Sequence, residues 1–103
     1  MIQSVEPSIT LKMIMDSGFL KAGTFLYSEL NINIQGVLNA DGSITVEIKG
    51  EKRNFPFPSG AARAIENRSL NGWIYWAVKE FGNYKNLAFF RNLYKESMQI
   101  NSK

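Results

Sequence analysis

The chain of 103 residues contains neither cysteine nor histidine. The absence of cysteine excludes disulfides and thiolate metal sites and fits a reducing compartment, so we expect a cytoplasmic protein. The absence of histidine removes the commonest general base and the commonest zinc ligand. The nine Asp and Glu residues are scattered and form no paired or regularly spaced acidic motif. We therefore expect no enzyme activity, no metal ion and no cofactor.

Long apolar runs are also missing. No run approaches the roughly 20 residues that a membrane-spanning helix requires, and the N-terminal segment MIQSVEPS lacks the pattern of a signal peptide, so we expect no membrane association. The composition is nevertheless 45% hydrophobic and 13% aromatic, enough to bury a core. The length suits one domain. The sequence predicts a flexible lead-in over residues 1–8, a single domain over residues 9–98 and a flexible tail over residues 99–103.

Charge is distributed unevenly along the chain. Residues 1–48 carry two cations and five anions, a net charge of −3, whereas residues 49–103 carry ten cations and four anions, a net charge of +6. An asymmetry of this sign favours an anionic partner. Chance alone also produces imbalances of a few charges in small domains.

The apolar patterns predict an α+β domain. A first helix capped by Ser8 or Thr10 ends at Gly18, and a strand follows around residues 24–28. Alternating segments at residues 32–38, 44–48 and 52–55 form a meander with a turn over residues 39–42. After these come a helix at 60–67, a strand at 73–78, a loop at 81–86 and a helix at 86–97. The result is a small, mostly antiparallel sheet, a meander plus one later strand, packed with three helices.

The most informative stretch is PSGAARAIENRSLNGWIYWAV, residues 58–78. Ser59 is predicted to cap the second helix, whose first turn is formed by small residues that a phosphate can approach closely. Arg63 and Arg68 would add positive charge nearby. The alternative is a plain capped helix whose alanines pack against the sheet.

The strand predicted after the Asn71-Gly72 turn carries three aromatic residues. Alternation places Trp73 and Tyr75 on the side opposite Trp76, as a platform on which bases can stack or as aromatics covered by a helix. A third candidate is the turn KGEKR, residues 49–53, which either contacts a phosphate backbone or is simply a charged sheet edge. The predicted nucleic-acid-binding residues are Lys52, Arg53, Ser59, Arg63, Arg68, Asn71, Trp73 and Tyr75.

These residues resemble the RAMA domain, the restriction enzyme adenine methylase associated domain of bacterial defence and DNA-modification systems. The matching features are ITLKMIMDSGFLKAGTFL at residues 9–26, the Asp41-Gly42 turn and PSGAARAIENRSLNGWIYW. The resemblance covers residues 9 to about 78 and does not include the last helix. The family motif falls on Ser59, Ala62, Arg63, Asn71, Gly72, Trp73 and Trp76.

The resemblance implies a non-catalytic, DNA-associated module that is often fused to methylases or nucleases and recognises DNA, including modified DNA. The first hypothesis is therefore a DNA-binding or modified-base-reading module in a restriction-modification context. The alternative is a protein-interaction module that docks Phe89, Phe90 and Tyr94 of the last helix onto a methylase, a nuclease, another protein or a second copy. An enzyme is disfavoured because no nucleophile and base are suitably spaced.

Overall fold

The computed structural model describes residues 9–101, and the predicted lead-in over residues 1–8 lies outside them. Along the chain run α1 (Leu11–Asp16), β1 (Phe25–Ser28), β2 (Gln35–Leu38), β3 (Ile44–Ile48), β4 (Glu51–Phe55), α2 (Pro58–Glu66), α3 (Gly72–Tyr75), β5 (Trp76–Glu80), β6 (Asn83–Asn86) and α4 (Leu87–Asn101). The strands form one antiparallel sheet in the order β4-β3-β2-β1-β5-β6. The α+β prediction is confirmed, with four helices in the described residues instead of three.

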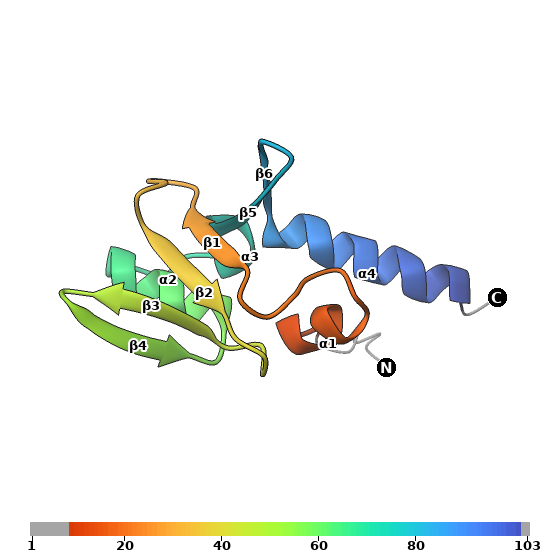
Figure 1. Cartoon of the computed structure of the whole chain (residues 1–103), viewed down its shortest axis with the longest axis horizontal. Coiled ribbons are helices and arrows are strands. Elements are labelled where there is room, and N and C mark those ends of the chain that lie inside the picture. Colours follow the sequence, from red (N-terminus) through yellow and green to blue (C-terminus); the bar gives the residue numbers. More distant parts are fainter. Residues whose placement is uncertain (1–8, 102–103) are drawn as a thin grey trace, which may run out of the picture.

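One face of the sheet carries the core. Ile44 and Val46 of β3 are buried beside Leu26 and Leu38, as the alternation predicts. Helix α2 packs on β3 and β4, and α4 packs on β5 and β6. Figure 1 shows α2 behind the strands and α4 extending away from the sheet beside α1. The opposite sheet face carries no helix among the described residues.

The N-terminal helix follows the prediction at both ends. Thr10 caps α1 by accepting a hydrogen bond from the Met13 N–H, at 3.2 Å. Gly18, just beyond the helix, has a φ of +91°, the left-handed conformation that glycine adopts easily. The apolar stripe that contains Leu11 and Ile14 is buried in the core.

The segment after Asn71 is helical where a strand was predicted. The Asn71 side chain accepts a hydrogen bond from the Trp73 N–H at 3.0 Å, and the Asn71 carbonyl accepts from the N–H groups of Ile74 and Tyr75. These are the bonds of a capped helical turn. The strand therefore begins only at Trp76, and the predicted alternation of Trp73 and Tyr75 with Trp76 is wrong.

Two further predictions at the C-terminal end are wrong. Residues 83–86 form strand β6, not a loop, because Phe81 and Gly82 have φ values of +49° and +82° and close a tight hairpin. Helix α4 continues through Asn101, beyond the predicted end at residue 97 and into the predicted tail. Residues 102–103 lie outside the described part of the chain.

Candidate nucleic-acid interface at the start of helix α2

The starts of α2 and α3 are joined directly. The Gly72 N–H donates to Ser59 Oγ at 3.0 Å, and the Trp76 indole N–H donates to the Pro58 carbonyl at 3.1 Å. A Cβ on Gly72 would overlap the backbone between Pro58 and Ser59, so only glycine fits there. We call these four residues, Pro58, Ser59, Gly72 and Trp76, the α2–α3 joint.

The joint changes the interpretation of Ser59. Helix α2 begins at Pro58, and its N-cap is Phe57, whose side chain makes no capping bond. The predicted cap at Ser59 is therefore wrong: its hydroxyl oxygen accepts a bond from α3. Part of the first turn that was expected to receive a phosphate is in contact with Gly72.

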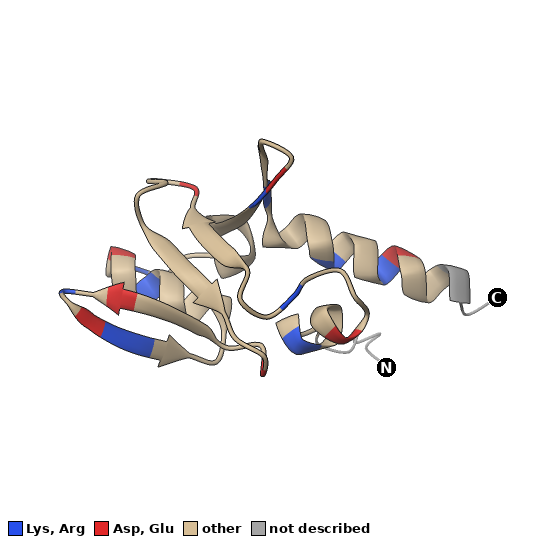
Figure 2. Cartoon of the chain, viewed as in Figure 1, with Lys and Arg blue, Asp and Glu red and all other residues tan. Residues whose placement is uncertain are grey.

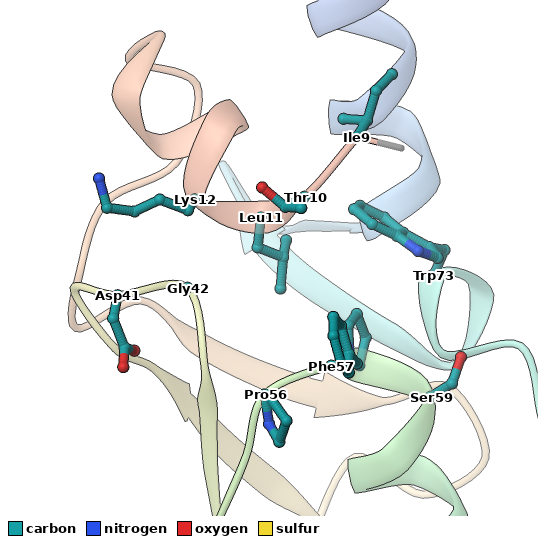
Figure 3. A pocket seen from close by; sticks show the side chains of 11 residues that line it. Ile9, Thr10, Leu11, Lys12, Asp41, Gly42, Pro56, Phe57, Ser59 and Trp73 are labelled. Atoms are coloured by element: carbon teal, nitrogen blue, oxygen red, sulfur yellow. The ribbon is translucent and has the colours of Figure 1, made fainter. Parts of the chain in front are cut away.

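A pocket of about 460 Å³ opens beside this joint. Figure 3 shows Lys12 and Asp41 at one end of it and Trp73 and Ser59 at the other, with Phe57 between them. The Phe57 side chain is 64% exposed, and Trp73 is half-buried. The lining comes from the start of α1, the β2–β3 turn, the segment before α2, and α3: Ile9, Thr10, Leu11, Lys12, Asp41, Gly42, Pro56, Phe57, Pro58, Ser59 and Trp73.

The pocket lining is mixed in charge. Lys12 forms an ion pair with Asp16 at 2.8 Å. Asp41 accepts hydrogen bonds from the side chain and backbone of Ser43, and these bonds lower the pKa of Asp41 below its usual value, so the carboxylate stays ionised. With one cation and one anion in the lining, the pocket is not the positively charged cradle that the sequence suggested.

Trp73 is held from one side by the last helix. The Arg91 guanidinium lies 4.7 Å from the centre of the Trp73 ring, a cation–π contact. Arg91 is not among the residues that line the pocket, so the pocket borders other parts of the indole. Within residues 9–101 the indole N–H makes no hydrogen bond. Trp73 therefore contributes an aromatic ring to the pocket lining and has an indole N–H donor that no described residue accepts.

Tyr75, in contrast, is buried, with 4% of its surface exposed. Its hydroxyl donates to Glu66 Oε2 at 2.7 Å, and its ring packs edge-on against Trp76 at 4.9 Å. Burial raises the pKa of Tyr75 to about 12, with a further increase from Glu66. The structure leaves this ring no accessible face, so the predicted pairing of Trp73 and Tyr75 as one platform is wrong.

The predicted cations are only partly brought together. Arg53 lies over the Phe55 ring at 5.2 Å, and Phe55 is the nearest side chain to Gly60 in the first turn of α2. Arg63 is exposed one turn after Ser59 on the same helix. Arg63 thus lies on α2, and Arg53 lies on β4 beside Phe55, which borders the first turn of α2.

The remaining cations are dispersed over other elements (Figure 2). Lys52 points to the opposite face of β4 from Arg53, because neighbouring residues of a strand alternate. Arg68 lies beyond the C-terminal end of α2 and borders a separate hollow of about 260 Å³ with Leu30 and Ile74. Asn71 caps α3.

The aromatic residues of α4 do not form one exposed patch. Phe90 is 2% exposed, and Tyr94 packs against the core. Phe89 is 39% exposed, and the Lys85 ammonium lies 4.7 Å from its ring centre. The surface on which the alternative hypothesis depended is therefore largely internal.

The sequence analysis did not identify Phe57 as a pocket residue, nor the parts of the pocket lining that come from α1 and the β2–β3 turn. An aromatic residue between two prolines, PFP at residues 56–58, was the one available signal, because such a segment is stiff and cannot join the sheet.

Residues 9–101 contain neither a candidate metal-binding cluster nor a candidate membrane-spanning helix. No group of three or more acidic side chains is placed to hold a metal ion. None of the helices there is both long and apolar enough to cross a bilayer.

A known protein family matches almost the whole chain. Residues 2–99 match the family model described as RAMA, Restriction Enzyme Adenine Methylase Associated. The match includes helix α4, which the resemblance in the sequence did not reach. The description associates the family with restriction enzymes and adenine methylases, a restriction-modification context. The chain belongs to the RAMA family.

Proposed function

We propose that this chain is a non-catalytic DNA-binding module that acts in the cytoplasm as part of a restriction-modification system. The observation that carries the proposal is the pocket beside the start of α2, with two aromatic residues in its lining, together with Arg63 on the same helix and Arg53 on the neighbouring strand β4. Neither arginine forms an ion pair with a described carboxylate. The family description supports the context.

The pocket suits a flat group that has left its base stack. Phe57 and Trp73 supply aromatic surface, and stacking of a base on such a ring contributes about 1–3 kcal/mol. The Trp73 indole N–H and the Ser59 hydroxyl supply hydrogen-bond donors to a base edge. We propose that an extruded or unpaired base occupies the pocket while Arg53 and Arg63 hold the flanking phosphates.

A methylated base would bury additional apolar surface in this pocket. Its lining includes Ile9, Leu11 and Pro56 as well as the two rings. Burial of one methyl group contributes about 0.8 kcal/mol, which corresponds to a preference of about fourfold. We propose that the module favours duplexes with N6-methyladenine by about this factor, and that F57A removes the preference.

The test is a fluorescence-anisotropy titration of a labelled duplex at several salt concentrations. Each phosphate contact adds about 0.9 to the slope of log affinity against log salt, so R53Q/R63Q should reduce that slope by about 2. K21Q/K85Q is the matched control, because it removes the same charge from elements away from α2. Absence of binding at low salt, or equal effects of the two double variants, would refute the proposal.

A methylase or nuclease subunit is the second candidate partner, and a different surface favours it. The hollow beside Arg68 is lined mainly by apolar side chains, among them Leu30 at 60% exposure and Ile74 at 48%. Exposed apolar surface with a charged rim is typical of a protein contact. L30S/I74S should abolish co-purification with such a subunit without changing duplex binding; unchanged co-purification would exclude this surface.

A further inference from the structure

The sheet face that no helix covers carries three aromatic rings on β1 and β6, the two strands that flank β5. Phe25 and Tyr27 of β1 point to this face because Leu26 and Ser28, which alternate with them along the strand, are buried on the other face. Tyr84 of β6 joins them, and its ring meets the Tyr27 ring edge-on at 5.5 Å. Phe25 is 56% exposed and Tyr84 is 41% exposed.

A cation lies among these rings. Lys79 is paired with Tyr84 across β5 and β6, and its ammonium is 5.7 Å from the centre of the Tyr84 ring. The β1–β5 register aligns Tyr27 with Ala77, and Lys79, two residues after Ala77 on β5, projects to the same face of the sheet as Tyr27. Lys79 has no carboxylate partner among the described residues. We call Phe25, Tyr27, Lys79 and Tyr84 the open-face platform.

The face is hollowed next to Phe25. A depression of about 230 Å³ is bordered by Phe25 and by polar side chains of β2, β3 and β4, namely Gln35, Thr45, Glu47 and Lys52. These side chains offer both donors and acceptors beside an exposed ring. A flat group with polar edges matches this combination better than an aliphatic side chain does.

We propose that the open-face platform binds single-stranded nucleic acid. Its rings supply stacking surfaces for successive bases, Lys79 and Lys52 supply positive charge for the backbone, and the depression receives a base edge. Aromatic residues on an open sheet face together with nearby cations are a general means of holding unpaired bases. The platform lies on the sheet face opposite α2 and α3, so it is a second site and does not depend on the pocket.

The test is a titration of labelled single-stranded oligonucleotides, DNA and RNA of one sequence, with wild type and F25A/Y84A. The double variant should weaken binding of at least one oligonucleotide by about 25-fold or more, about fivefold for each ring. F81A is the matched control, because Phe81 is 98% exposed in the β5–β6 turn, outside the platform. Thermal melts establish that each variant is folded.

Three outcomes would overturn the proposal. In the first, F25A/Y84A binds both oligonucleotides with the affinity of the wild type; in the second, F81A loses as much affinity as F25A/Y84A. In the third, the wild type forms a concentration-dependent dimer that F25A/Y84A abolishes. The last outcome would show that a second copy covers this face. Amide shifts in NMR spectra confined to β1, β5 and β6 on adding the oligonucleotide would support the platform. Failure here leaves duplex binding through Arg53 and Arg63 untouched, so the two proposals fail separately.

Discussion

Substitution of Gly72 by alanine tests the joint on which the pocket depends. The added methyl group would overlap backbone atoms of Pro58 and Ser59, which cannot move aside as a flexible side chain can. Overpacking of this kind costs about 1–3 kcal/mol. Separation of α2 from α3 would also stretch the hydrogen bonds at 3.0 and 3.1 Å, each worth about 1 kcal/mol. The better helix propensity of alanine offsets at most about 1 kcal/mol of this loss in stability.

The net expectation for G72A is a loss of about 2–4 kcal/mol in the free energy of unfolding. For a domain of about 100 residues this lowers the melting temperature by at least about 8 °C. The assay is thermal unfolding followed by near-ultraviolet circular dichroism, which reports on Trp73 and Trp76.

The matched control is G60A in the first turn of α2. A Cβ on Gly60 would meet only a Phe55 ring carbon, at 3.9 Å, so alanine should be neutral or stabilise the protein by about 0.5–1 kcal/mol. A melting temperature of G72A within about 2 °C of wild type would refute the close approach of the two helices.

Three further substitutions test other contacts. S59A leaves a buried amide of α3 without its acceptor and should cost about 1–2 kcal/mol in urea unfolding, whereas S69A, at an exposed position, should change stability by less than about 0.5 kcal/mol. Burial raises the pKa of Tyr75 to about 12, so the folded state retains a proton that the unfolded state loses near pH 10. The free energy of unfolding should therefore fall between about pH 10 and pH 12, and it should fall less steeply in Y75F. G36A would place a methyl group 3.0 Å from a Val46 methyl group, at an expected cost of about 1–3 kcal/mol in thermal melts.

The meander could be predicted because its signals are local. Alternation in β3 and the Asp41-Gly42 turn predict two antiparallel strands joined by a turn, and the structure confirms this pairing of β2 with β3. The charged turn at Lys49 and Gly50 likewise joins β3 to β4, with positive φ at both residues. Each of these features depends on residues only a few positions apart.

The segment from Asn71 to Trp76 could not be assigned from its own residues. Asn-Gly before alternating aromatics fits a hairpin turn followed by a strand, and it also fits a capped helical turn. The hydrogen bond from Gly72 to Ser59, thirteen residues earlier, accompanies the helical form. Strand β6 was missed for a different reason: its turn places Phe81 at positive φ, where Asn or Gly is usual.

Only part of the pocket lining could be predicted from the sequence. Ser59 and Trp73 belong to the recognised stretch, but Lys12, Asp41 and Phe57 come from other segments and approach only in the folded chain. The composition determines the net charge, but it does not determine where the charged side chains lie in the folded chain. Folding separates Lys52 from Arg53 by strand alternation and leaves the pocket lining with one charge of each sign.

The residues of the family motif have different physical roles. Ser59, Gly72 and Trp76 form the α2–α3 joint together with Pro58, so the fold dictates their identity. Trp73 lines the pocket, and its position follows from the joint because it comes directly after Gly72 in α3.

Arg91 of α4 completes the support of Trp73 from outside the motif, and its buried Nε has no hydrogen-bond partner among the described residues. A buried guanidinium nitrogen without a partner costs free energy unless the contact with the ring offsets it. Helix α4 therefore contacts the candidate site through Arg91 in addition to its packing on β5 and β6. This dependence gives a physical reason for the family match to continue through residue 99.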